Sequence, residues 1–403
     1  MTSKIIIGLA LLLLTSCVAV ENILGTESRV SHTNVIVDEA KEIRTNVTNT
    51  PEEILTLEKK IGQMLMVGFF GTSAKPNSKI CQDIRNYNLG GVILFDFNPT
   101  NKSKPKNISG KKQLTQLTKA LQLCSPDNKL LIAVDQEGGR VQRLKNKYGF
   151  YGNFPKASEI TVKDENEVRN IYENMGKELR DAGINFNLAP VVDLSINPKN
   201  IVINKLGRSF GKDPEEVAKY TTIFMNAMHK NHVLTSLKHF PGHGSSLGDT
   251  HKGFVDVTND WKDIELSPYR ILIGKNNIDT IMVAHVFNKT LDDKYPASLS
   301  EKTIHGTLRK GLNYKGVVIT DDLQMGAIDK KFGLKETLRL AINAGDDILL
   351  FGNQLNPRNI LPTEKLVNEI LELVYENKIG MDKINSAYSR IQKLKDRYFN
   401  TKY

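Results

Sequence analysis

The 403-residue sequence predicts an α/β fold, a (β/α)₈ TIM-type barrel in a single domain with C-terminal packing helices. Short, nearly continuous apolar runs recur from Ile61 onward, and a stretch with helical spacing follows each run. Strands that are apolar on both faces and alternate with helices belong to parallel sheets covered by helices. Eight such units in about 300 residues match a closed barrel. A doubly wound open sheet is the alternative, but no Gly-x-Gly-x-x-Gly motif follows the first strand, so dinucleotide binding has no support.

The predicted strands share an apolar, β-branched composition. In chain order they are Met64–Gly68, Gly91–Phe95, Leu130–Asp135, Phe186–Val192, Val233–Leu237, Thr280–Ala284, Gly316–Thr320 and Asp347–Phe351.

Helices are predicted between and after these strands. Apolar residues recur at helical spacing around Leu117 and Tyr172, and again in two C-terminal stretches around Ile370 and Ile391. Helix starts are indicated by a capping residue followed by proline at Asp213-Pro214 and Ser267-Pro268. Gly90 and Gly345 are expected to end helices just before strands.

The N-terminal 50 residues are predicted to lie outside the domain. Ile5 to Leu14 is an apolar run after Lys4, and at roughly 20 residues per membrane span it is too short to cross comfortably. It is typical of a signal peptide over residues 1–16. The sequence before Cys17 resembles the lipobox of bacterial lipoproteins, which implies that Cys17 is lipidated. The lipid would anchor the protein to the cell envelope, on the periplasmic face or outer membrane. An ordinary signal peptide is the alternative. Residues 17–50 are expected to form a linker, and residues 51–403 the domain.

The composition excludes several classes of protein. Hydrophobic residues make up 40 % and charged residues 25 %, which is incompatible with a disordered chain or a multi-span membrane protein. The net charge of +10 suggests an anionic partner. However, the lysines are spread among acidic residues without a compact basic and aromatic stretch, so no nucleic-acid binding is expected. We also expect a monomer.

Two cysteines remain in the predicted domain. Cys81 and Cys124 show no metal-type spacing. A disulfide is allowed in an oxidising compartment, but two buried free thiols are the favoured interpretation.

Polar and ionisable residues gather where the predicted strands end. Asp135 ends the third strand, Asp193 the fourth, Lys238 and His239 follow the fifth, and Asp321 follows the seventh. Strand ends in a barrel meet at one rim, where active sites lie. The sequence therefore predicts a pocket lined by charged groups and imidazoles.

The motifs at this rim identify a family. They are DQEGGRV (135–141), LGRSFG (206–211), KHFPGHG (238–244) followed by DTH (249–251), and ITDDL (319–323). Together they resemble family 3 glycoside hydrolases, in particular the β-N-acetylglucosaminidase branch, over about residues 57–351. Many β-glucosidase-type members carry a second domain that supplies a glutamate acid/base. This chain ends in helices, which favours the single-domain hexosaminidase branch.

The resemblance implies the catalytic groups. Retaining glycoside hydrolysis needs a nucleophilic carboxylate and a proton donor. Asp321 matches the nucleophile, while Asp322 is expected to make loop hydrogen bonds. His251, paired with Asp249, matches the family's acid/base, and the carboxylate would favour the imidazolium and orient the ring.

The resemblance also implies the substrate-binding groups, which are Asp135, Arg143, Arg208, Lys238 and His239. Structural roles remain open for several residues of these motifs. Glu137 and Arg140 are candidates for an ion pair, Lys238 for neutralising carboxylates, His243 for stabilising the loop and His285 for packing. The Gly- and Ser-rich loop 242–252 suggests a mobile lid that carries His251.

The predicted function is an exo-acting retaining β-N-acetylglucosaminidase that removes terminal β-GlcNAc from peptidoglycan fragments or chito-oligosaccharides, without a cofactor or metal. The alternatives are a GlcNAc phosphorylase on the same scaffold and a non-catalytic glycan-binding surface lipoprotein. A metal-dependent hydrolase is less favoured because the first two strands end without histidine.

Overall fold

The computed structural model describes residues 51–275, 278–355 and 360–400. The predicted signal peptide, Cys17 and linker lie outside the described residues. The fold below is that of the compact unit Leu55–Tyr403. Among the described residues, no helix has the length and apolar character that a membrane span requires.

Eight parallel strands form the barrel in the hydrogen-bonded order β10-β1-β2-β3-β4-β5-β7-β9. They are β1 (Leu65–Gly68), β2 (Gly91–Ile93), β3 (Leu131–Val134), β4 (Phe186–Asn187), β5 (Leu234–Phe240), β7 (Thr280–Val283), β9 (Val317–Thr320) and β10 (Leu349–Phe351). A parallel bridge between Ile319 and Ile348 joins β9 to the approach to β10 and closes the ring. All eight predicted strands are therefore confirmed.

Strand lengths differ from the prediction at β4 and β5. The predicted fourth strand ran to Val192, but the ladder stops at Asn187. Pro190, which has no N–H to donate, follows closely. Strand β5 instead continues through Lys238 and His239 to Phe240, with an irregular register against β7.

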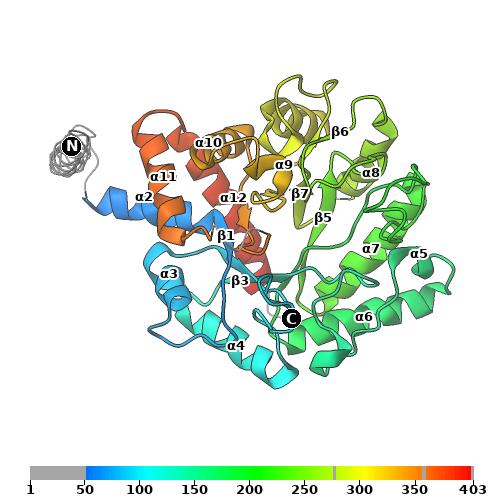
Figure 1. The fold of residues 1–403 in the computed structure, drawn as a ribbon, viewed down its shortest axis with the longest axis horizontal. Helices are drawn as coiled ribbons and strands as arrows, with labels where there is room; N and C mark the ends of the chain where they lie inside the picture. The colour runs from blue at the N-terminus through cyan, green and yellow to red at the C-terminus, as the bar shows by residue number, and fades with distance from the viewer. Residues whose placement is uncertain (1–50, 276–277, 356–359, 401–403) are drawn as a thin grey trace, which may run out of the picture. The chain divides into compact units, whose positions relative to one another are not determined.

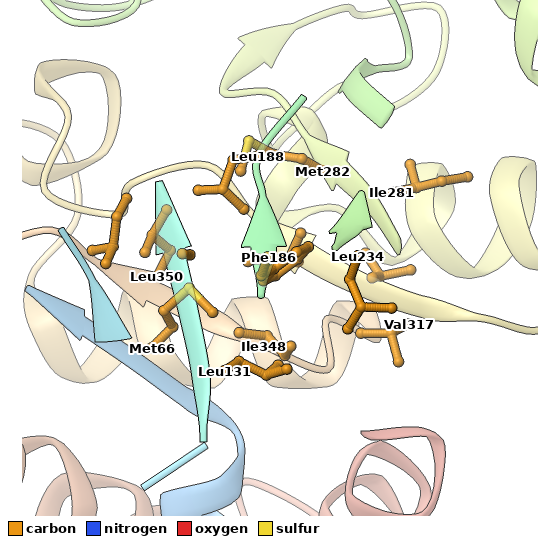
Figure 2. Close-up of a cluster of buried hydrophobic side chains, with 14 of the residues drawn as sticks. Met66, Leu131, Phe186, Leu188, Leu234, Ile281, Met282, Val317, Ile348 and Leu350 are labelled. Atoms are coloured by element: carbon orange, nitrogen blue, oxygen red, sulfur yellow. The ribbon is translucent and has the colours of Figure 1, made fainter. Parts of the chain in front are cut away.

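The barrel interior is filled by apolar side chains from strands all around the ring. Figure 2 shows this cluster, in which each labelled side chain is 3 % exposed or less: Met66, Leu131, Phe186, Leu188, Leu234, Ile281, Met282, Val317, Ile348 and Leu350. The barrel is consequently a solid core, and polar chemistry is confined to its ends.

A helix follows each strand and covers the barrel from outside (Figure 1). These helices are α3 (Lys79–Tyr87), α4 (Lys111–Cys124), α6 (Glu165–Asp181), α7 (Pro214–Lys230), α8 (Ser267–Gly274), the π-helix η4 (Lys302–Gly311), α10 (Leu334–Ala344) and α11 (Thr363–Tyr375). Helix α2 (Pro51–Gln63) precedes β1, and α12 (Met381–Asn400) follows α11. The loops contain the short helices η1 (Asn146–Tyr148), α5 (Ala157–Ile160), η2 (Asp263–Leu266), η3 (Ala297–Leu299) and α9 (Gly326–Asp329), and the paired strands β6 (Val255–Asp256) and β8 (Val286–Phe287).

The predicted helix ends are partly confirmed. Asp213 caps α7 by accepting the Glu215 N–H, and Gly345 ends α10 in the left-handed conformation. Ser267 is wrong as a cap because the preceding 3₁₀ turn already places it in helical conformation. Gly90 is also wrong as a helix end, since Asn88 takes the left-handed position after α3.

Cys81 and Cys124 form a disulfide, so the expectation of two free thiols is wrong. Cys81 lies on α3 and Cys124 at the end of α4, and their Cα atoms are 5.2 Å apart. The two cysteine side chains are buried, as expected. Spacing along the chain could not show that these two helices pack side by side with the cysteines facing.

The C-terminal helices complete the end of the barrel opposite the strand carboxyl ends. Arg309 of the π-helix and Arg390 of α12 both bind the carboxylate of Asp347, just before β10, at 2.8 Å. The buried Lys395 of α12 donates to the Gly90 carbonyl oxygen and to the side chain of Gln63. These contacts tie the end of the chain to the start of the barrel.

Candidate active site

A pocket of about 350 Å³ opens at the carboxyl ends of the strands. Apolar side chains such as Ile93, Leu188, Met282 and Leu350 line it together with the polar groups. Every residue that the sequence predicted for the site lines this one pocket: Asp135, Arg143, Arg208, Lys238, His239, Asp249, His251 and Asp321. The strand-end argument and the family motifs together therefore pointed to side chains that lie around one pocket, although Asp193, at the end of the fourth predicted strand, does not line it.

Asp321 follows β9 directly and is half-buried. Its Oδ1 accepts the backbone N–H of Asp322 at 2.8 Å. Burial alone would raise the pKa of Asp321, but His285, His239 and His251 outweigh burial and hold its pKa below the ordinary value. The carboxylate is thus ionised at neutral pH, as a nucleophile must be.

Asp322, the next residue, also lines the pocket but makes its own set of hydrogen bonds. Its Oδ1 accepts the backbone N–H groups of Gln324 and Gly352 at 3.1 Å each. Burial raises the pKa of Asp322 to about 6. The predicted loop hydrogen bonds are confirmed, and they fix the segment that follows Asp321.

Asp249 and His251 form a local pair on the loop after β5. The ring Nδ1 of His251 lies 3.0 Å from Asp249 Oδ1, and the His251 backbone N–H donates to the same oxygen at 3.1 Å. This arrangement fixes Nδ1 as the protonated nitrogen and leaves Nε2 available for proton transfer. The His251 side chain is 56 % exposed, whereas that of Asp249 is 18 % exposed.

A buried ion network lies along one wall of the pocket. Lys238 Nζ is 3.0 Å from Asp135 Oδ1 and 2.7 Å from Glu137 Oε1. Arg208 grips Glu137 through two hydrogen bonds of 2.8 Å, and Arg143 bonds Asp135 at 3.0 Å. Three cationic side chains thus share two carboxylates, so some of their N–H groups remain able to donate hydrogen bonds to an oxygen-rich ligand.

The ion network corrects one alternative from the sequence. Glu137 pairs with Arg208 and Lys238, and Arg140, its suggested partner, is exposed. Sequence reasoning therefore missed Glu137 as the residue that organises two of the predicted binding groups. Burial raises the pKa of Glu137, but Arg208 and Lys238 overcome this and lower the pKa to about 2.

Asp193 is the second functional residue that the predicted set lacks. Its Oδ2 lies 2.7 Å from His239 Nδ1, and its Oδ1 accepts the backbone N–H groups of His239 and His243. The position of Asp193 at the end of the fourth predicted strand was the available signal. By holding Nδ1–H, Asp193 leaves Nε2 of His239 as the nitrogen available to the pocket.

His243 and His285 have the structural roles that the sequence left open for them. His243 is buried, with Nδ1 2.7 Å from Ser246 Oγ, and burial lowers its pKa to about 4. His285 Nδ1 is 2.6 Å from Ser298 Oγ, and its Nε2–H donates to the Asp322 carbonyl oxygen at 3.0 Å. Both rings are buried and hydrogen-bonded, and they support the loops that follow β5 and β9.

The loop after β5 is held more tightly at its start than a flexible lid would be. Asn200 Nδ2 donates to the carbonyl oxygens of His243 and Gly244, and Ser245 and Ser246 are buried. A Cβ on Gly244 would lie 1.9 Å from a backbone oxygen. Residues 242–246 of the suggested lid are therefore buried and hydrogen-bonded, whereas Leu247 and His251 farther along it are exposed.

No group of three or more histidine, cysteine, aspartate or glutamate side chains is arranged to hold a metal ion in the part of the chain that the structure describes.

The chain is similar to known proteins over most of its length. The Glycosyl hydrolase family 3 N terminal domain matches residues 56–394. Beta-hexosaminidase A of Pseudoalteromonas piscicida is 32 % identical over 85 % of this chain, and beta-hexosaminidase of Tolumonas auensis is 36 % identical over 67 %. The chain spans 61 % of the first relative and 77 % of the second.

Among solved structures, a family 3 beta-N-acetylglucosaminidase from Paenibacillus sp. str. FPU-7 superposes with a TM-score of 0.75 at 31 % identity. The match covers 87 % of this chain and 64 % of the Paenibacillus chain.

Proposed function

The chain belongs to glycosyl hydrolase family 3, and from this premise we propose that it is an exo-acting, retaining β-N-acetylglucosaminidase. One observation carries the proposal: an ionised carboxylate, Asp321, and an Asp249–His251 pair line the same pocket. A carboxylate nucleophile and a separate proton donor are what double displacement at a sugar requires. Beta-hexosaminidase relatives support terminal β-GlcNAc as the sugar.

In the first step, an Asp321 oxygen attacks the anomeric carbon and forms a glycosyl ester as the bond to the leaving oxygen breaks. His251, protonated at Nε2, donates that proton to the leaving oxygen. Asp249 stabilises the imidazolium through its bond to Nδ1–H. In the second step, neutral His251 removes a proton from water, the water oxygen attacks the anomeric carbon, and Asp321 is released with net retention.

The ion network is the proposed sugar-binding wall. Asp135 accepts hydrogen bonds from sugar hydroxyls, while Arg143, Arg208, Lys238 and His239 donate to hydroxyls or to the acetamido group. Because these cations are already held by buried carboxylates, they need little reorganisation on binding. The pocket volume of about 350 Å³ suits one terminal sugar better than a long chain.

We further propose that the substrates are peptidoglycan fragments or chito-oligosaccharides, and that the protein is a lipoprotein. In this proposal residues 1–16 are removed, lipidated Cys17 anchors the chain to the cell envelope, and residues 17–50 link it to the domain. Incorporation of labelled fatty acid that is abolished by Cys17→Ser would support the anchor. Unlabelled wild-type protein recovered in the soluble fraction would contradict it.

The test of the chemistry uses Asp321→Asn and His251→Ala with an aryl β-GlcNAc and a GlcNAc disaccharide. His251→Ala should lower kcat for the disaccharide by about 10²–10⁴-fold, the usual contribution of general acid–base catalysis, and Asp321→Asn should abolish turnover of both substrates. Matched controls are His305→Ala and Asp293→Asn, two exposed residues outside the pocket.

Product analysis completes the test. Retained β-configuration in free GlcNAc supports hydrolysis by double displacement. A sugar phosphate formed only when phosphate is added would favour the phosphorylase alternative, and binding without turnover would favour a glycan-binding protein. Wild-type rates in Asp321→Asn would refute the assigned nucleophile.

A further inference from the structure

A buried glutamate outside the pocket supports the loop that carries the proposed acid/base. Glu265 lies on η2 and is 1 % exposed. Its Oε2 accepts the backbone N–H of Gly244 at 2.8 Å and that of Ser245 at 3.4 Å. These are buried donors in a loop, so without an acceptor they would carry the full penalty of desolvation.

The surroundings of Glu265 disfavour the ionised form of its carboxyl group. The negative charge of Asp193 adds to the rise in the pKa of Glu265, and Glu265 in turn raises the pKa of the buried Tyr269, so neither neighbour offsets the charge of Glu265. Burial raises the pKa of Glu265 to about 7, against hydrogen bonds from Ser245 and Gly244. The two backbone N–H groups are therefore the contacts that stabilise this buried carboxyl group.

The two amides lie a few residues before the Asp249–His251 pair. The ring of His243, just before these amides, connects the two regions: its Nδ1 lies 2.7 Å from Ser246 Oγ and its Nε2 lies 3.5 Å from Thr250 Oγ1. At the pair itself, the Ala327 N–H donates to the Thr250 carbonyl oxygen at 3.2 Å, and the Gly326 N–H donates to the His251 carbonyl oxygen at 3.4 Å. Glu265 therefore anchors the N-terminal side of the stretch that places His251, and the α9 region anchors its C-terminal side.

We propose that Glu265 is a positioning residue, whose carboxylate seats the Gly244–Ser245 backbone and thereby sets the position of His251 over the sugar leaving group. It touches neither substrate nor reacting atoms. The inference rests on the proposed function, because it gives Glu265 a role only through His251.

The test compares Glu265→Ala with Glu265→Gln. The amide oxygen of glutamine still accepts the two N–H groups, whereas alanine leaves both without a partner. Each variant is assayed on a GlcNAc disaccharide, whose alcohol leaving group needs a proton, and on an aryl β-GlcNAc with an acidic phenol, which leaves without one. Glu178→Ala is the matched control, since Glu178 accepts the Tyr151 N–H of a different loop and lies outside the pocket.

Glu265→Ala should lower kcat for the disaccharide by at least about tenfold, the scale of a small displacement of a catalytic group, and should affect the glycosylation step with the aryl substrate much less. Glu265→Gln should restore most of the loss. In the His251→Ala background, Glu265→Ala should cause no further loss, because the two residues act through one group.

Three outcomes would overturn the proposal: equal losses on both substrates, losses that add to those of His251→Ala, or wild-type rates in Glu265→Ala. Hydrogen exchange gives a reading that does not depend on activity. Glu265→Ala should speed exchange of the 244–251 amides, with thermal unfolding still cooperative, and unchanged protection would contradict the anchoring. A wild-type protein that cleaves neither substrate would defeat the proposed function, while the exchange experiment would still decide whether Glu265 holds the loop.

Discussion

Replacing Glu137 by glutamine removes the charge that two buried cations share. Arg208 and Lys238 would keep their positions but lose their common carboxylate. The native structure lowers the pKa of Glu137 from 4.5 to about 2, which at about 1.4 kcal/mol per unit of pKa corresponds to about 3 kcal/mol. Breaking a buried pair from one side costs a similar amount, about 3–5 kcal/mol. We therefore expect Glu137→Gln to lower the free energy of unfolding by about 3 kcal/mol at pH 7.

The assay is urea unfolding, followed by circular dichroism, between pH 7 and pH 3. Because the pKa of Glu137 is lowered in the folded state, its contribution is complete above pH 4.5 and is lost as the pH falls toward 2. The difference between wild type and variant should shrink over that range. The control is Glu159→Gln, an exposed partner of Lys156, for which a change of no more than about 0.5 kcal/mol is expected.

The reasoning would be refuted by a loss below about 1 kcal/mol at pH 7, since that is the size of a surface pair. It would also be refuted by a difference that stays constant as the pH falls. In kinetic assays of the folded variant, KM should rise, because Arg208 and Lys238 belong to the proposed sugar-binding wall.

The remaining predictions concern the disulfide, the loop after β5, Glu265 and metal dependence. Replacing Cys81 and Cys124 together by serine should lower the free energy of unfolding by about 4 kcal/mol, from their separation of 43 residues and loop entropy; an unchanged urea midpoint would exclude this. Gly244→Ala should reduce kcat, because its Cβ would lie 1.9 Å from a backbone oxygen, whereas Gly274→Ala, with open space, should retain it. The pKa of Glu265 is raised in the folded state, so the free energy of unfolding of the wild type should fall by up to about 3 kcal/mol, relative to Glu265→Gln, as the pH rises from 4.5 through 7. Free energies of unfolding that change in parallel with pH in the two proteins would contradict this. Dialysis against EDTA should leave activity unchanged, and a loss restored by added zinc would contradict the metal-free chemistry.

The fold was predictable because buried parallel strands appear as continuous apolar runs. Segments such as Thr280–Val283 and Val317–Thr320 are buried throughout and were located nearly to the residue. Strand ends were less predictable, because ladder length depends on the neighbouring strand. The ladder at β4 ends after Asn187, while β5 extends to Phe240.

The site was predictable to the extent that its residues follow strands or lie in recognisable motifs. Which of these residues form ion pairs with one another was not predictable. Glu137 and Arg208 are 71 residues apart, whereas Arg140, the partner suggested by proximity, is exposed. Glu265 gave no signal in the sequence, since a glutamate in a polar stretch before a helix is ordinarily a solvated residue. Partners that meet only through tertiary structure require coordinates.

The adjacency of β1 and β10 determines when this domain can finish folding. One edge of Leu65–Val67 pairs only with Leu349–Phe351, and the α12 side chain Lys395 must then reach Gly90. Until the last part of the chain is available, the growing barrel has open strand edges, which favour aggregation. Contacts of such long sequence separation also form slowly. For the exported lipoprotein proposed above, this late closure is an advantage, because a chain that cannot complete its barrel early stays competent for passage across a membrane.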